Sequence, residues 1–384
     1  MGTETLTYED NLIPDDGSTG IEIEDTSGEE RITQPFNPSL IRVETRLMTI
    51  DLLVARIREK ELDLGTGFQR KAGIWKEDAQ SRLIESILIR IPLPAFYLDA
   101  TDDDKWLVVD GVQRLTTLRR FIIDEEKLRL IGLEFLDQLE GKNFDELPRN
   151  FQRRILETQV TVYLIEQGTP DEAKFNIFKR INTGVLPLSA QEIRHALNQG
   201  KAAELLERLA NSEEFKKATD YGIRDERMAD RECVLRFLAF TITPYTEYTN
   251  IKPNGFDNFL NDSMAKINKM EMSDLENLER RFLRAMQAAL DIFGKDAFRK
   301  LYKVDGRRNP INKALFESWS VNLNLLDDNQ IKSLIKKKHI LNNKFIKLMN
   351  KSTFNDAISQ ATGNSSKVKL RFSEIETLIK EVLS

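Results

Sequence analysis

The stretch Trp106–Phe121, WLVVDGVQRLTTLRRF, indicates how the first part of this chain folds. Its first four residues, Trp106–Val109, form a short apolar run rich in β-branched side chains, which predicts a buried strand. Asp110 and Gly111 are typical of a turn. Apolar residues from Leu115 onward then recur at helical spacing. The stretch therefore predicts a strand, a tight turn and a helix.

The start of this predicted helix carries groups that could hold an anion. Backbone N–H groups at a helix N-terminus lack intrahelical partners and attract negative charge, and Gly111 lets the backbone approach a ligand closely. Arg114 offers a planar fork for a phosphate, Gln113 can donate and accept hydrogen bonds, and Asp110 could hold a metal ion or a sugar hydroxyl. The alternative is a purely structural turn, in which Asp110 caps the helix and pairs with Arg114.

Three motifs resemble those of the GmrSD-type restriction endonuclease N-terminal domain family. Residues 110–118, DGVQRLTTL, resemble its DGQQR signature, although Val112 stands where the family has its first Gln. Residues 68–75, with Phe-Gln-Arg and a final Trp, resemble an upstream element, and residues 178–194, FKRINTGVLPLSAQEIR, resemble the family's "FxRINTG…LSxQEIR" element. The three motifs together cover about residues 45–200, in the family's order and spacing.

The resemblance implies an α+β, ParB/sulfiredoxin-like N-terminal domain with a small mixed sheet. It implies that this domain handles nucleotides or DNA in restriction and phage defence. The expected ligand is a nucleoside triphosphate, with Mg²⁺ as an optional companion. Catalytic roles are expected for Asp110, Gln113 and Arg114. The expected nucleotide- or phosphate-binding residues are Gln69, Arg70, Gly111, Arg180, Asn182, Thr183, Gly184 and, from a late RRNPINKALFE stretch, Lys313.

Composition divides the chain into three regions. Residues 1–35 contain ten Asp or Glu against one basic residue, Arg31, which predicts a disordered acidic tail. This tail could be a solubilising leader, or it could mimic nucleic acid and mask a basic groove. Residues 36–200 form the predicted α+β domain. Residues 201–384 are dominated by helical periodicity and predict a mostly α-helical domain.

The last part of the helical region is strongly basic. Residues 332–371 carry ten Lys or Arg against one acid, Asp356, in a chain whose net charge is −5. Such a cluster favours contact with the phosphate backbone of DNA, the alternative being a solvated helical face that balances the acidic tail. The expected DNA-binding residues are Lys336, Lys337, Lys338, Lys344, Lys347, Lys367, Lys369 and Arg371.

Several classes of protein are disfavoured by what the sequence lacks. One cysteine, Cys233, leaves no disulfide framework, and we expect it in the core. Two distant histidines argue against an HNH nuclease and a histidine metal site, so no protein metal site is expected. The sequence has no P-loop motif, no membrane span and no signal peptide, which leaves a cytoplasmic protein as the expectation.

Three functions remain open from the sequence. The favoured one is a nucleotide-binding enzyme or switch of a restriction system, in which nucleotide state controls DNA binding or a partner nuclease or defence subunit, with hydrolysis of the triphosphate left open. The second is a DNA-binding module without catalysis. The third is a DNA endonuclease, and whether the chain turns over any substrate stays undecided.

Overall fold

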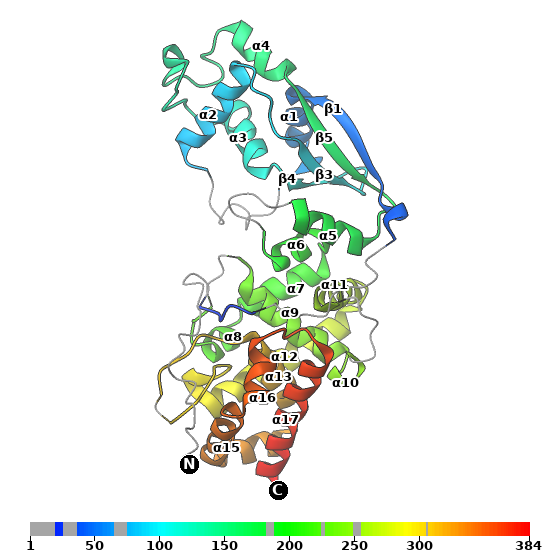
Figure 1. Cartoon of the computed structure of the whole chain (residues 1–384), viewed down its shortest axis with the longest axis vertical. Helices are drawn as coiled ribbons and strands as arrows, with labels where there is room; N and C mark the ends of the chain where they lie inside the picture. Colours follow the sequence, from blue (N-terminus) through cyan, green and yellow to red (C-terminus); the bar gives the residue numbers. More distant parts are fainter. Residues whose placement is uncertain are drawn as a thin grey trace, which may run out of the picture. The chain divides into compact units, whose positions relative to one another are not determined.

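The computed structural model of this chain describes residues 20–25, 37–64, 75–181, 188–223, 227–248, 255–304 and 306–384. The chain forms two compact units (Figure 1). Phe36–Leu188 is named the sheet unit here, and Met1–Pro35 together with Ser189–Ser384 the helical unit. The α+β class and the mostly helical second half are confirmed. None of the described helices is long and apolar enough to cross a membrane.

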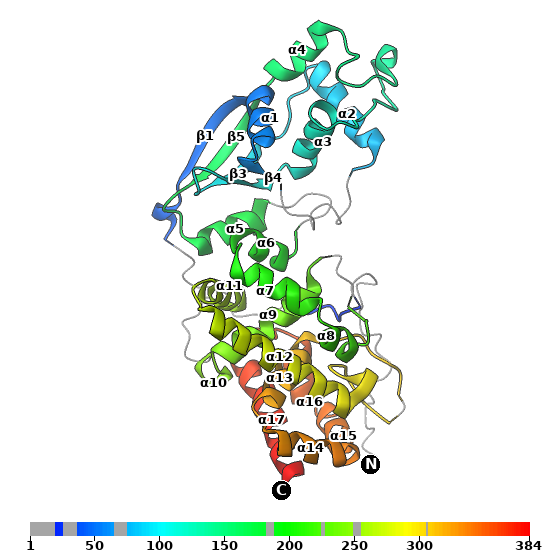
Figure 2. The ribbon, with the colours of Figure 1, turned by 180° about the vertical axis from the view of Figure 1, so that it is seen from behind.

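The sheet unit is built on a mixed sheet of five strands in the order β1-β5-β3-β4-β2 (Figures 1 and 2). Antiparallel pairs, β1 with β5 and β3 with β4, alternate with parallel pairs, β5 with β3 and β4 with β2. The antiparallel strands β3 and β4 follow each other in the chain, and β4 ends at the DGVQR turn. The strands are β1 (Val43–Thr49), β2 (Leu62–Asp63), β3 (Phe96–Ala100), β4 (Trp106–Asp110) and β5 (Gln159–Glu166).

Helices cover both faces of this sheet. The helices of the unit are α1 (Ile50–Arg58), α2 (Glu77–Leu88), α3 (Val112–Ile122), α4 (Arg149–Glu157) and α5 (Asp171–Ile181), with short 3-10 turns at Pro38–Leu40 and Asp137–Leu139. Alternate residues of β5, such as Val160 and Val162, join one core with the apolar sides of α1, α2 and α3. On the opposite face, Lys174 of α5 approaches Asp99 of β3 at 3.8 Å. The period-two alternation of each strand decides which residues face which layer.

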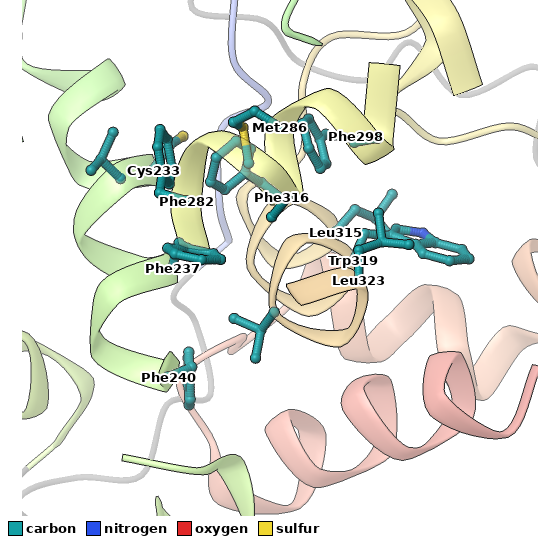
Figure 3. Close-up of a cluster of buried hydrophobic side chains, with 14 of the residues drawn as sticks. Cys233, Phe237, Phe240, Phe282, Met286, Phe298, Leu315, Phe316, Trp319 and Leu323 are labelled. Carbon is teal, nitrogen blue, oxygen red and sulfur yellow. The ribbon is translucent and has the colours of Figure 1, made fainter. Parts of the chain in front are cut away.

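The helical unit packs its helices around one apolar core. Its helices are α6 (Ala190–Leu197), α7 (Lys201–Ala210), α8 (Glu213–Ala218), α9 (Ala229–Ile242), α10 (Tyr245–Tyr248), α11 (Gly255–Asn268), α12 (Met272–Phe293), α13 (Lys313–Asn324), α14 (Asp328–Lys336), α15 (Lys338–Met349), α16 (Ser352–Ser359) and α17 (Ser365–Leu383), with a 3-10 turn at Gly294–Asp296. Figure 3 shows aromatic side chains of α9, α12 and α13 gathered near its centre, including Phe237, Phe282 and Phe316. Cys233 is fully buried beside them, as expected.

The boundary between the units lies between Leu188 and Ser189, whereas composition placed it at residue 200. Ser189 is the N-cap of α6 and forms a capping box with Glu192. This helix is held in the helical unit, since Glu192 pairs with Arg227 at 3.2 Å and Arg194 pairs with Asp257. The ion pairs join residues far apart in sequence, and for that reason composition does not reveal the boundary.

Part of the acidic N-terminal region is folded, and for this part the prediction of a disordered tail is wrong. Residues 20–25 lie in the helical unit, where Ile21 is buried in the core and bridges in parallel to Ile311. Two carboxylates of this segment, Glu22 and Glu24, form ion pairs with buried cations. The composition of residues 1–35 as a whole hides this short Ile-Glu-Ile-Glu segment. Its side chains contact residues far along the chain, which composition does not reveal.

Candidate functional site

The DGVQR turn connects β4 to α3 through a left-handed residue. Gly111 is the N-cap of α3 and has φ +101°, a conformation that L side chains rarely adopt. A Cβ atom at this position would overlap the Phe96 ring of β3, whose Cε1 would lie 3.0 Å away. Gly111 is therefore required twice, for its backbone conformation and for the close approach of Phe96. The first N–H groups of α3 follow this residue at the helix N-terminus, where such groups have no intrahelical acceptor.

Arg114 is the residue that holds this turn together. Its guanidinium donates to the backbone oxygens of Pro94 and Ala95, and to a carboxylate oxygen of Asp110 at 2.8 Å. The guanidinium also lies 4.4 Å from the centre of the Phe96 ring. Burial lowers the pKa of Arg114, and the neighbouring Asp110 charge partly opposes this shift. The pairing of Arg114 with Asp110 is the one expected of a structural turn, but the cap of α3 is Gly111 and makes no side-chain hydrogen bond.

Asp110 keeps part of its carboxylate accessible. It is the last residue of β4, and its side chain is 34% exposed although it pairs with Arg114. Among the described residues, no three His, Cys, Asp or Glu side chains come together as a metal site. A single partly exposed carboxylate is what Mg²⁺ commonly uses when phosphate oxygens and water supply its other ligands.

Gln113 joins two of the sequence motifs. Its side-chain oxygen accepts a hydrogen bond from the backbone N–H of Trp75 at 3.2 Å. Trp75 ends the motif that contains Gln69 and Arg70, which themselves lie outside the described residues. The last residue of the upstream motif is thus fixed at the first turn of the signature helix.

Gln80 is a contributor to this junction that sequence reasoning missed. It is 1% exposed, and its amide donates to the Trp75 carbonyl at 2.5 Å and accepts from Arg120 at 2.8 Å. A signal for it exists, because Gln80 lies three and four residues before Leu83 and Ile84 on the apolar side of α2. A polar residue on such a face needs buried partners.

The remaining predicted nucleotide-binding residues are placed in three ways. Arg180 is exposed near the end of α5, a helix that packs against β4 in the sheet unit. Asn182, Thr183 and Gly184 lie outside the described residues. Lys313 belongs to the helical unit, where its ammonium is 2.9 Å from Glu232 and 3.5 Å from Glu24. Attraction from these carboxylates raises the pKa of Lys313 against the opposing effect of burial.

The predicted DNA-binding residues separate into exposed, paired and buried side chains. Lys336, Lys338, Lys347 and Lys369 are exposed on α14, α15 and α17. Three others are partly buried and engaged. Lys337 donates to the carbonyl of Val382, Lys344 pairs with Glu381, and Lys367 pairs with Asp356.

For Arg371 the prediction is wrong. Its side chain is fully buried and pairs with Glu317, which is fully buried too. It also donates to the carbonyl of Thr362 at 2.7 Å. A guanidinium without solvent access, paired in this way, is a core group and does not meet a DNA backbone in this structure.

Comparison with known proteins gives one family. Residues 60–198 match the family model described as GmrSD restriction endonuclease, N-terminal domain. The match contains the DGVQR turn, Trp75, α5 and α6. A search of curated proteins found no match to the chain.

Proposed function

We propose that this chain, whose residues 60–198 match the model of the GmrSD restriction endonuclease N-terminal domain, binds a nucleoside triphosphate at the DGVQR turn as part of a restriction-type defence system. The observation that carries the proposal is the hydrogen bond from the Trp75 backbone to Gln113. It brings the end of one family motif to the first turn of another. Two motifs that meet at a helix N-terminus suit an anionic ligand better than an isolated turn does.

The residues of the turn would share the work of binding. The first N–H groups of α3 and the helix dipole would receive phosphate oxygens. Asp110 would hold Mg²⁺ together with those phosphates, or orient a water molecule. Arg114 would act mainly as a positioning residue, because its guanidinium already bonds to Asp110 and to backbone carbonyls.

Gln69, Arg70 and Arg180 would supply further contacts to the phosphates. Bound Mg²⁺ would neutralise developing charge on the transferred phosphoryl group, which is what hydrolysis of the triphosphate requires. Arginines that approach the same group would add to this stabilisation. Because Val112 replaces a family glutamine, a contact made by that amide elsewhere in the family would be missing in this chain.

The test is isothermal calorimetry with ATP, GTP, CTP and UTP, with and without Mg²⁺, on the intact chain. The variant is Asp110→Asn, which keeps an acceptor for Arg114 but removes the negative charge. We expect one nucleotide to bind, and its Mg²⁺-dependent affinity and turnover to fall in this variant. Failure of all four nucleotides to bind would refute the proposal.

A matched control separates loss of a ligand from loss of an ion pair. Asp124 is paired with Arg119 of the same helix, and its side chain is 34% exposed like that of Asp110, but it lies beyond the opposite end of α3. Asp124→Asn should bind nucleotide as the wild-type chain does. An equal loss in both variants would show that the turn is only structural.

A second candidate function, DNA binding without catalysis, is favoured by the exposed lysines of the helical unit. Lys336 and Lys338 are exposed on neighbouring helices, where they could contact phosphates. K336Q/K338Q should weaken DNA binding and lower the salt slope by up to about 2, since each phosphate contact contributes roughly 1. The charge-matched control K217Q/K269Q, at exposed positions of the same unit, should change neither.

The same titration decides between the two candidates. DNA affinity that depends on nucleotide would support a switch that acts on DNA or on a partner nuclease. DNA affinity indifferent to every nucleotide would support the non-catalytic module. Cleavage of plasmid by the pure chain with Mg²⁺ or Mn²⁺ would instead favour an endonuclease.

A further inference from the structure

The folded acidic segment, residues 20–25, packs against buried cations of the helical unit, and the site that it covers, which contains Arg236, Lys300 and Lys313, is named the groove here. It is attached by few backbone hydrogen bonds. Glu22 donates to the Ile311 carbonyl at 2.8 Å, Ile311 donates to Gly20 at 3.2 Å, and Ala361 donates to Asp25 at 2.6 Å. Ile21 is buried, whereas Ile23, two residues on, is 51% exposed. Two β-bridges, Ile21 with Ile311 and Asp25 with Gln360, show that the segment is extended, and its glutamates and isoleucines alternate along it.

Glu24 binds an arginine fork. Its two carboxylate oxygens accept from the two terminal nitrogens of Arg236 at 2.8 and 2.5 Å, and one of them also accepts from the Thr362 hydroxyl at 2.8 Å. Burial alone would raise the pKa of Glu24, but attraction by Arg236 and Lys313 outweighs it and lowers the pKa to about 2. The groove therefore binds a carboxylate strongly in its charged form.

Glu22 has an equivalent set of donors. Its carboxylate accepts from the ammonium of Lys300 at 2.6 Å and from the side-chain amide of Asn312 at 3.1 Å. Lys300 and Glu22 are 4% and 6% exposed. Lys300 also donates to the Ser359 hydroxyl at 2.6 Å.

The charges of the groove do not balance without this segment. The cations Arg236, Lys300, Lys313 and Arg371 face Glu22 and Glu24 of the segment, and Glu232 and Glu317 of α9 and α13. Without the first two carboxylates, two more cations than carboxylates would remain among these residues. Buried charge left in this way is costly, so the groove requires an anionic occupant.

We propose that the groove is an anion-binding site which residues 20–25 fill in cis, and that successive phosphates of a single-stranded nucleic acid compete for it. An arginine fork, two ammonium groups, an amide and a hydroxyl are donors that proteins use for phosphate oxygens. Glu22 and Glu24 lie two residues apart on an extended chain, a separation of about 7 Å. Successive phosphates of a strand likewise present single charges at regular intervals. The inference goes beyond nucleotide binding at the DGVQR turn, since it concerns other residues in the other unit.

The test measures binding of a fluorescent single-stranded oligonucleotide to the full chain by anisotropy, without nucleotide. Glu22→Gln with Glu24→Gln removes both charges from the segment and weakens its hold. The control E271Q/E276Q removes two charges from exposed positions at the start of α12. We expect the E22Q/E24Q chain to bind several-fold tighter than the wild type and the control. Its salt slope should steepen by about 1.4, at roughly 0.7 for each phosphate contact of a single strand.

A peptide of residues 19–26, TGIEIEDT, supplies the competing arm. Added in excess, this peptide should reverse the gain in oligonucleotide affinity of the E22Q/E24Q chain. The same peptide with Gln in place of both Glu residues should have no effect. Equal affinity of E22Q/E24Q and the control would overturn the proposal, because net charge alone would then explain the change. So would binding of the labelled peptide that the oligonucleotide cannot displace, since the groove would then be a peptide site.

Hydrogen exchange on the wild-type chain keeps the test decisive if E22Q/E24Q does not fold. The backbone amides of Glu22, Ile311 and Ala361 donate three of the hydrogen bonds that join the segment to the groove. Saturating oligonucleotide should speed exchange at all three. Unchanged exchange in the presence of bound oligonucleotide would refute competition for the groove.

Discussion

Replacing Gly111 with alanine tests the account of the signature turn most directly. The new methyl group would meet two separate obstacles, the positive φ of +101° and the ring of Phe96. A left-handed conformation costs an L residue roughly 1–2 kcal/mol. Forcing an extra carbon into a packed site costs typically about 1–3 kcal/mol more. Gly111→Ala should therefore destabilise the sheet unit by about 2–5 kcal/mol.

Gly141→Ala is the matched control, because it isolates the first of these two costs. Gly141 lies in the same unit and has φ +75°, but a Cβ atom there would meet nothing within 4 Å. Its substitution should cost only the conformational part, about 1–2 kcal/mol.

The assay is calorimetric unfolding of the full chain, with the transition of the sheet unit assigned by hydrogen exchange. For a unit of this size, each kcal/mol corresponds to a shift of roughly 2–4 °C in Tm. The Tm should fall clearly further for Gly111→Ala than for Gly141→Ala. Equal shifts would refute the role of Phe96, and no shift in either variant would refute the argument from backbone conformation.

Three further predictions concern the helical unit. The pKa of Glu24 is lowered from its ordinary value of 4.5 to about 2, so the stability that this carboxylate contributes is complete above pH 4.5 and is lost as pH falls towards 2. In thermal unfolding, Glu24→Gln should therefore reduce the loss of Tm between these two pH values. Burial raises the pKa of the Cys233 thiol, so a thiol reagent at pH 8 should modify it only after denaturation. Arg371→Ala removes the nearest partner of the buried Glu317, which keeps its more distant ion pair with Arg236 at 3.5 Å, and should cost about 3–5 kcal/mol by urea unfolding. Lys369→Ala on the exposed side of the same helix should stay within about 0.5 kcal/mol.

Local patterns predicted the elements of the fold because their causes are local. The apolar run at Trp106–Val109, the turn at Asp110 and the helical spacing after it all correspond to observed elements. The capping box at Ser189 is present for the same reason, since its hydrogen bonds join residues three apart. Arg114 was found by its motif, but its partners at Pro94 and Ala95 depend on how two strands pair.

The count of basic residues wrongly predicted that Arg371 binds DNA, whereas the helical periodicity around it predicts burial. Arg371 falls on the helical face that also carries Val368, Ile375 and Ile379, all of them buried. Its position on α17 therefore predicts burial, while the surrounding lysines suggest an exposed basic surface. The docking of Glu24 had no comparable signal, because Arg236 is more than 200 residues away and only the folded helical unit brings the two together.

The limits of the family match differ from the limits of the folded units. The match begins after β1 and α1, yet β1 pairs along β5 and α1 buries Ile50 and Leu53 completely. At its other end, the match includes α6, which belongs to the helical unit. A recombination event that moved only residues 60–198 would leave an unpaired strand edge behind and remove a helix from another core. The matched residues 60–198 are thus fewer than the residues that must stay together for both cores to remain complete.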